Sequence, residues 1–184
     1  MRSVALGLGL GLGSTIFLAM ASSGCSALGG VAAGPAYAIA KEHQSAGALN
    51  AYAGVGLGDE DISLGGGGEL RVKIGPSIGH FAIGPFAYAF SGGRDSVVTP
   101  FLRFGFNLLQ FETVESRFAF GMFSPRAEVG VIFRIVEELG MSLGIDGEYV
   151  LRFTDTPNTG YASFTIGFAA VKKSGPPPRF SRLY

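Results

Sequence analysis

Apolar and polar side chains alternate along the segment GMSLGIDGEYVLRF, residues 140–153. Leu143 and Ile145 share one parity, whereas Asp146 and Glu148 share the other. Successive side chains of a β-strand point to opposite faces, so this segment would present one apolar face and one charged face. In a soluble barrel the apolar face packs inward, whereas in a membrane-spanning barrel it contacts lipid and the charged face lines the lumen.

The same two-residue period recurs along the chain, with turn-like residues between the segments. The eight predicted strands are 48–57, 67–74, 80–90, 99–108, 116–123, 126–135, 140–153 and 161–171. Short connections join consecutive strands as antiparallel hairpins. The sequence therefore predicts an all-β fold, an eight-stranded antiparallel up-and-down barrel over residues 48–171, with a bulge at Gly84-Pro85 and a turn at Ser124-Pro125.

Composition favours lipid around this barrel. Charged residues make up 15% of the chain, against roughly 25% in soluble domains. Lys73 is the only lysine in a predicted strand, and glycines stand beside the charges on the polar faces. A soluble surface usually carries many lysines and glutamates, whereas a narrow lumen needs small residues beside long ones. We therefore predict a transmembrane β-barrel; a secreted or lipid-anchored soluble barrel that binds an apolar ligand is the alternative.

The polar faces would bring charges of both signs into a lumen that eight strands leave barely wide enough for side chains. Charges in such a space need partners. We expect an interior charge network of six cations and four carboxylates: Glu69, Arg71, Lys73, Arg103, Arg126, Glu128, Arg134, Asp146, Glu148 and Arg152. A static network that fills the barrel is favoured over a proton or ion path.

Aromatic side chains near the strand ends are typical of the girdle that a membrane barrel places at its interfaces. The expected girdle residues are Phe81, Phe90, Phe101, Phe123, Tyr149, Phe153 and Tyr161. Such residues point away from the lumen.

The first 24 residues indicate an export signal, because Arg2 precedes an apolar run. Cleavage is expected after Ala21 or before Cys25. Residues 22–25 resemble a bacterial lipobox, so Cys25, the single cysteine, is a candidate lipidation site; simple secretion with an unmodified Cys25 stays open. Residues 25–47 are predicted to form a flexible linker, and residues 172–184 a flexible, basic, Pro-rich tail.

Over residues 48–171 the chain resembles the small eight-stranded outer-membrane barrels of the OmpA and OmpX type. The stretch TGYASFTIGF, which ends at Phe168, is similar to the terminal amphipathic strand that the assembly machinery of such barrels reads. The resemblance implies a Gram-negative outer membrane, periplasmic termini, and outer-membrane lipid and the barrel-assembly machinery as partners. Basic residues do not cluster, so we expect no nucleic-acid partner.

The sequence offers little that catalysis could use, and we expect no enzyme activity, no cofactor and no metal. Some small outer-membrane barrels are lipid-modifying enzymes that use a histidine, and this chain has only His43 and His80. We interpret His80 as an interfacial residue beside a periplasmic turn, and the acidic residues 59–61 as a solvated loop tip. The expected role is structural, in membrane integrity or in surface interaction, with a lipid-modifying barrel enzyme as a further alternative.

Overall fold

A computed structural model describes residues 26–39, 45–58, 61–92, 96–114, 117–154 and 157–172. The strands are β1 (Ser26–Ile39), β2 (Ser45–Gly58), β3 (Ile62–Ile74), β4 (Ile78–Ser91), β5 (Val98–Asn107), β6 (Leu109–Val114), β7 (Arg117–Gly121), β8 (Ser124–Val136), β9 (Leu139–Val150) and β10 (Thr159–Lys172). Within the described ranges, no helix has the length and apolar character needed to cross a membrane. The predicted export signal and Cys25 lie outside these ranges, as does the predicted tail beyond residue 172.

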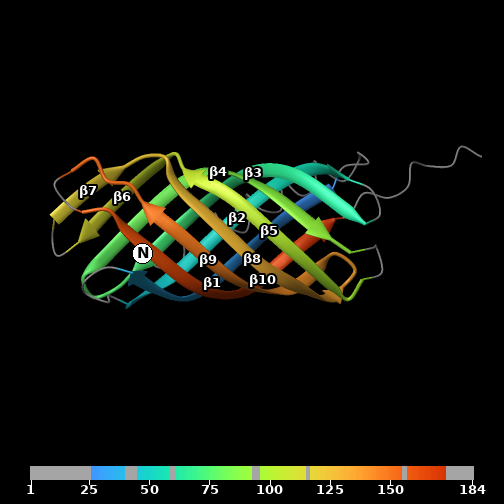
Figure 1. Cartoon of the computed structure of the whole chain (residues 1–184). Coiled ribbons are helices and arrows are strands. Elements are labelled where there is room, and N and C mark those ends of the chain that lie inside the picture. The colour runs from blue at the N-terminus through green and yellow to red at the C-terminus, as the bar shows by residue number, and fades with distance from the viewer. Residues whose placement is uncertain are drawn as a thin grey trace, which may run out of the picture.

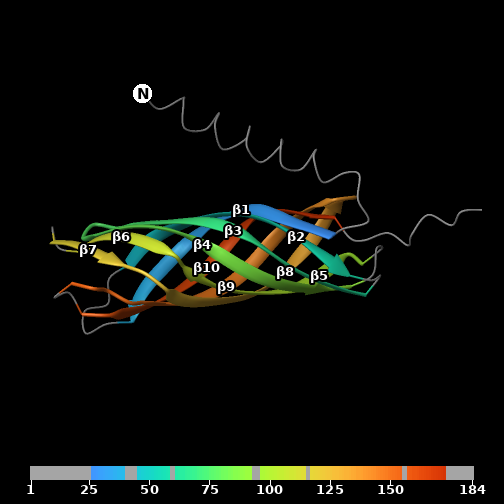
Figure 2. The ribbon, with the colours of Figure 1, turned by 90° about the horizontal axis from the view of Figure 1, so that it is seen from above.

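The strands form one closed antiparallel barrel, seen from two directions in Figures 1 and 2. From β1 to β4 and from β8 to β10, consecutive strands pair with one another, and β1 pairs with β10 to close the wall. Both β5 and β6 pair with β4, while β8 pairs with β5 and β7 with β6. The pairs β5/β6 and β7/β8 therefore each act as one wall strand. The prediction of a closed, eight-stranded, antiparallel up-and-down barrel is confirmed.

The eight wall strands are not the eight that the sequence predicts. The expected linker at 25–47 is wrong, because residues 26–39 form β1, which pairs with β2 on one side and β10 on the other. Its sequence, SALGGVAAGPAYAI, consists mostly of small residues and so has weak alternation. The predicted strands 116–123 and 126–135 are one wall strand, because Ser124 and Pro125 continue the pairing with β5 instead of forming a turn. Because one wall strand is missing from the prediction and another is predicted as two, the predicted number of strands is still eight.

The β5/β6 wall strand is irregular at Leu108. Ile83 pairs with Leu109 and Phe86 with Gly105, so this wall strand has one more residue than β4 over the same stretch. Odd-numbered residues consequently point inward in β5, whereas even-numbered residues point inward in β6. On the neighbouring wall strand, Phe123 has a φ of 56°, a left-handed conformation that is uncommon outside glycine.

The predicted bulge at Gly84-Pro85 within β4 is wrong. Strand β4 pairs with β3 from Ile62↔Ser91 to Ile74↔Gly79 with no shift of register. Its even-numbered residues therefore point inward along its whole length. The apparent change of parity in the sequence arises because aromatic residues occupy inward positions in the second half of the strand.

The two ends of the barrel differ in their connections. We call the end where β1 begins and β10 ends the terminus end, since Ala27 pairs there with Lys172. The β2–β3, β4–β5 and β8–β9 connections lie at the terminus end, and the other four lie at the opposite or far end. Because β1 precedes the first predicted strand, the connections on either side of β3 lie at the ends opposite to those expected. His80 is therefore near the far end.

Two glycines test the closure of the barrel. A Cβ atom at Gly34 in β1 would lie 1.9 Å from the carbonyl oxygen of Phe164 in β10, whereas a Cβ atom at Gly68 would meet no atom within 4 Å. We expect Gly34→Ala to lower the free energy of unfolding by about 1 to 3 kcal/mol, because the strands must separate. Gly68→Ala should leave it unchanged or slightly higher. Urea unfolding in lipid vesicles measures both, and equal effects would contradict the β1–β10 pairing.

Candidate functional site

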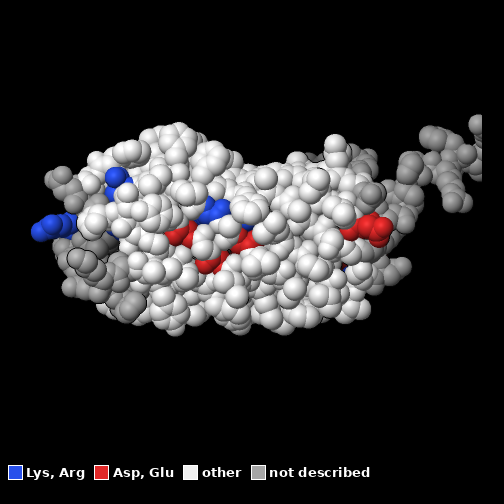
Figure 3. All heavy atoms as spheres, viewed as in Figure 1, with Lys and Arg blue, Asp and Glu red and all other residues white. Residues whose placement is uncertain are grey.

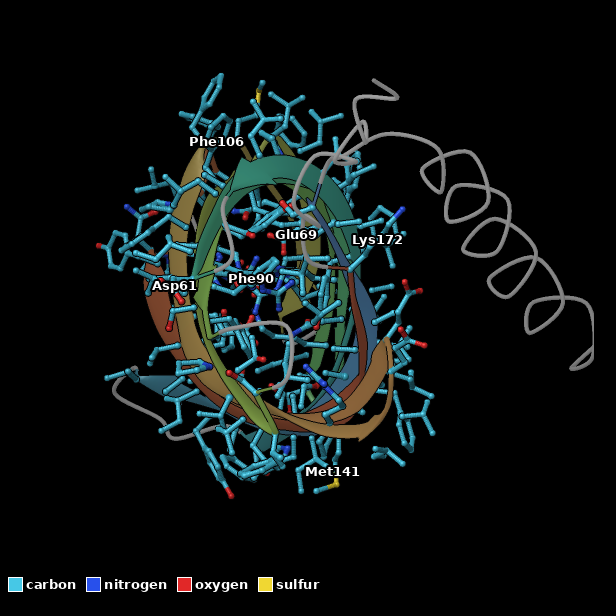
Figure 4. The ribbon with its side chains drawn as sticks, turned by 90° about the vertical axis from the view of Figure 1, so that its right-hand side faces the viewer. Asp61, Glu69, Phe90, Phe106, Met141 and Lys172 are labelled. Atoms are coloured by element: carbon cyan, nitrogen blue, oxygen red, sulfur yellow. The ribbon has the colours of Figure 1, made fainter. Side chains whose placement is uncertain are left out.

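Charged side chains from four strands meet in the middle of the lumen. They stand at alternate positions, so the pleat of each strand turns them to the same side. They are Glu69, Arg71 and Lys73 of β3, Arg103 of β5, Arg126 and Glu128 of β8, and Asp146 and Glu148 of β9. Each is at most 4% exposed. In the view along the barrel, Glu69 lies within the ring of strands (Figure 4).

Arg71 joins opposite parts of the wall. Its Nη1 lies 2.8 Å from Oε2 of Glu148, and its Nη2 donates to the carboxylate of Asp146. Lys73 also donates to Glu148. Since β3 and β9 are not neighbours in the sheet, these ion pairs cross the lumen. The guanidinium Nε additionally lies 3.3 Å from Oδ1 of Asn50.

Arg126 joins the remaining carboxylates to this network. Its Nε lies 3.2 Å from Oδ1 of Asp146, its Nη2 lies 2.8 Å from Oε2 of Glu128, and its Nη1 donates to Glu69. Arg103 donates to the same Glu128 oxygen, and its guanidinium carbon lies 3.6 Å from the centre of the Tyr52 ring. Eight charged residues thus form one connected set, which we call the central network.

A second cluster lies towards the far end. Oε1 of Glu112 accepts a hydrogen bond from the Tyr161 hydroxyl at 2.5 Å, and its Oε2 accepts one from Nε of Arg152 at 2.6 Å. His80 lies between this cluster and the central network. Its Nδ1 is 3.8 Å from Oε1 of Glu112, and its Nε2 is 3.4 Å from Oε1 of Glu148.

The sequence interpretation missed Glu112 and misplaced His80. Glu112 lies between the predicted strands 99–108 and 116–123, yet Gln110 and Glu112 alternate there with Leu109 and Phe111, and this alternation indicates a short strand. His80 is buried in the lumen, so its assignment as an interfacial residue at a periplasmic turn is wrong. Its inward direction follows from the unbroken parity of β4.

Of the ten residues expected in the interior network, eight form the central network and Arg152 pairs with Glu112. The contacts above do not include Arg134, which is half-buried two residues before the end of β8. If Arg134 is left out of the expected set and Glu112 is added, the set contains equal numbers of cations and carboxylates. Among the described residues, the two clusters contain five carboxylates (Glu69, Glu112, Glu128, Asp146 and Glu148) and five cations (Arg71, Lys73, Arg103, Arg126 and Arg152).

Aromatic side chains fill the lumen at the terminus end. We call the set Tyr52, Phe86, Tyr88, Phe90 and Phe101 the aromatic plug. The Tyr88 and Phe90 rings stack with centroids 5.7 Å apart and an interplanar angle of 6°. Figure 4 looks into this end and shows Phe90 inside the ring of strands.

The expected aromatic girdle is correct only in part. Phe90, Phe101 and Tyr161 are buried in the lumen, at 3%, 4% and 2% exposure, so their assignment to the girdle is wrong. The remaining four point outward and are exposed: Phe81, Phe123, Tyr149 and Phe153.

The outer face of the barrel wall is apolar. Ile145, Val129 and Phe168 are 62%, 58% and 56% exposed, although all three lie within strands. Among the outward positions of the described strands, Lys172 at the last position of β10 is the only charged residue. Figure 3 accordingly shows a largely uncoloured surface, with charged residues at the two ends and in one small group midway. The charged side chains that β8 and β9 contribute to the central network are buried.

Comparisons with known proteins identify the fold. No family model matches the chain, and no curated protein does. Among solved structures, the barrel is similar to Neisserial surface protein A (NspA), with 16% identity, a TM-score of 0.58, and coverage of 80% of this chain and 97% of that one. It is also similar to the outer membrane enzyme PagL, with 14% identity, a TM-score of 0.51, and coverage of 79% and 97%. The chain therefore has the fold of the small eight-stranded outer-membrane barrels.

The cross-lumen ion pairs can be tested at Arg71. Arg71→Met would remove one cationic partner from each of two buried carboxylates, Asp146 and Glu148, so we expect the free energy of unfolding to fall by about 3 to 5 kcal/mol. Arg117→Met, at an exposed position, should change it little. Equilibrium unfolding in urea gives both values. Equal, small effects would mean that the central network does not hold the barrel together.

Proposed function

We propose that this chain is an integral β-barrel of a bacterial outer membrane, with a structural, membrane-integrity or surface-interaction role and no catalytic activity. The observation that carries the proposal is the inversion of polarity across the wall. Side chains that would be a core in a soluble protein face outward, while the charged side chains face inward. Soluble monomers rarely expose apolar patches of more than a few hundred Å², whereas lipid requires such a surface.

The interior supports a structural role. Ion pairs occupy the middle of the lumen and the aromatic plug occupies its terminus end, where a carried apolar ligand would otherwise lie. A soluble ligand-binding barrel would need the opposite arrangement, with an apolar cavity inside and a hydrated surface outside. This arrangement favours the membrane protein over that alternative.

The position of His80 argues against the lipid-modifying alternative. A base that acts on membrane lipid must reach the lipid-facing side of the wall, yet His80 faces two carboxylates inside the lumen. The similarity to PagL concerns the fold, and a fold can host unrelated activities. We therefore propose outer-membrane lipid and the barrel-assembly machinery as the partners, with recognition through the apolar wall.

Export and anchoring belong to the same proposal. We propose cleavage of the first 21 or 24 residues, with lipidation at Cys25 in the second case. Labelling with a fatty-acid analogue in the wild type and in Cys25→Ser separates the two cases. Loss of the label in the variant supports the anchor, whereas equal labelling refutes it.

The effect of one substitution, Ile145→Arg, on the folding free energy distinguishes a wall surrounded by lipid from a wall surrounded by water. Ile145 is 62% exposed in the middle of β9, and Val136 is 57% exposed at the end of β8. In a membrane, Ile145→Arg should cost about 2 to 4 kcal/mol of folding free energy, and Val136→Arg near the rim about 0 to 1 kcal/mol. Folding titrations in lipid vesicles and heat-modifiable mobility in detergent gels measure the difference.

In water, an exposed Ile145→Arg would instead be neutral or would improve solubility. A harmless Ile145→Arg, together with recovery of the protein in the soluble periplasmic fraction, would overturn the proposal. Reduced assembly of Ile145→Arg alone, with Val136→Arg assembled normally in the membrane fraction, would support it.

A further inference from the structure

His80 is held between two carboxylates that come from different strands. Its Nδ1 lies 3.8 Å from Oε1 of Glu112 in β6, and its Nε2 lies 3.4 Å from Oε1 of Glu148 in β9. The side chain is 0% exposed. Both distances are slightly longer than ordinary hydrogen bonds. Each ring nitrogen therefore faces an acceptor.

A neutral imidazole cannot satisfy this arrangement. It has one N–H and one lone pair, so one of its nitrogens directs a lone pair at a carboxylate oxygen. The imidazolium form has two N–H groups and can donate to Glu112 and Glu148 together. Protonation of His80 would replace one repulsive contact with a hydrogen bond, and both contacts could then shorten.

The other charged groups around the ring limit this effect. Lys73 donates to Glu148 and lies 4.3 Å from the centre of the Tyr161 ring, so its ammonium group repels a proton on His80. Arg71 and Arg152 already neutralise much of the charge on the two carboxylates. Burial also disfavours the charged ring. These opposing effects together set how readily the ring takes up a second proton.

Polar groups connect His80 to the far end of the barrel. Glu112 accepts from Arg152, and the backbone N–H of Arg152 donates to Oδ1 of Asn158 at 2.8 Å in the β9–β10 connection. Arg152 also donates to the exposed Pro157 carbonyl oxygen. Arg152 thus ties Glu112 to the exposed far rim, and since a guanidinium keeps its protons, Arg152 positions this carboxylate and does not pass protons itself. Towards the terminus end, the aromatic plug follows the central network. Apart from the hydroxyl groups of its two tyrosines, the plug contains no group that could pass a proton along the barrel axis.

We propose that His80 is a proton-binding site, supplied from the far end of the barrel through the carboxylate of Glu112, which Arg152 holds in place, and separated from the terminus end by the aromatic plug. The ligand is a proton from the medium at the far end, and the bond formed is the second N–H bond of the imidazole ring. The inference goes beyond the proposed structural role, because the lumen would respond to conditions on one side of the wall.

The first test measures the proton on His80 directly. The chain has two histidines, so His43→Gln leaves His80 as the single imidazole signal in nitrogen NMR spectra of the full chain in detergent micelles. We expect the ring to change from neutral to doubly protonated as the medium is acidified. In the same background, Glu112→Gln should weaken proton binding at least about tenfold, because it removes a facing carboxylate.

Glu69→Gln is the matched control, since it removes a carboxylate of the central network that does not face His80. A midpoint that moves in Glu112→Gln and stays in Glu69→Gln supports the proposal. A ring that stays neutral throughout, or equal shifts in the two variants, overturns it.

The second test concerns the aromatic plug. Vesicles that contain a trapped pH-sensitive dye report proton leakage through the inserted barrel. The wild type should leak no faster than empty vesicles, whereas Tyr88→Ala/Phe90→Ala, which removes the stacked pair, should leak faster. Adding His80→Gln to that variant should abolish the extra leakage, because the proton chain is then interrupted.

Leakage by the wild type, or leakage in the plug variant that His80→Gln does not reduce, overturns the proposed path. Heat-modifiable mobility shows whether each variant is folded before it is compared. If the plug variant does not fold, Phe90→Ala alone is used, and the NMR titration decides the proton site independently of either variant.

Discussion

The structure depends on the neutralisation of charge inside a narrow barrel. Eight wall strands leave little room for water, so each buried charge must find an opposite charge or a hydrogen-bond donor within the lumen. Arg71 and Arg126 do this by contacting two or three carboxylates each, across the lumen and along the wall. Equal numbers of buried carboxylates and cations in the two clusters follow from the same requirement.

This constraint also explains the distribution of small residues. Long charged side chains need space, and the wall provides it where glycines and alanines stand beside them. A Cβ atom at Gly144, for example, would lie 2.7 Å from Oε1 of Glu128. Close packing of the strands makes a similar demand at Gly34, where β1 meets β10. The glycine content that distinguishes the sequence thus serves the interior and the closure of the wall.

The two halves of the lumen are filled differently, and this asymmetry connects structure with function. The terminus end contains stacked aromatic rings, which need no partners, whereas the middle and the far end contain ionisable groups. Arg103 joins the two halves, because its guanidinium pairs with Glu128 and covers the Tyr52 ring. Outside, a continuous apolar wall suits the hydrocarbon of a membrane. A barrel filled in this way is well suited to span a membrane without opening a passage.

Features that depend on local alternation could be predicted from the amino-acid sequence alone. The two-residue period predicted strands, short connections predicted antiparallel order, and lysine scarcity with glycine-spaced charges predicted which face is inward. These signals are local because adjacent side chains on a strand necessarily point to opposite faces. They led to the barrel and to nine of the residues that the ion pairs contain, although two errors in the strand boundaries cancelled in the count.

Features that depend on pairing between distant strands emerge only in the folded chain. The weakly alternating segment 26–39 becomes β1 because β2 and β10 offer pairing partners on both sides. Phe86, Tyr88 and Phe90 point inward because the register with β3 keeps one parity along β4. Glu112 and His80 meet because β6 continues the wall beside the start of β4. A single strand carries no information about its partner's register, so these contacts could not be read from the alternation alone.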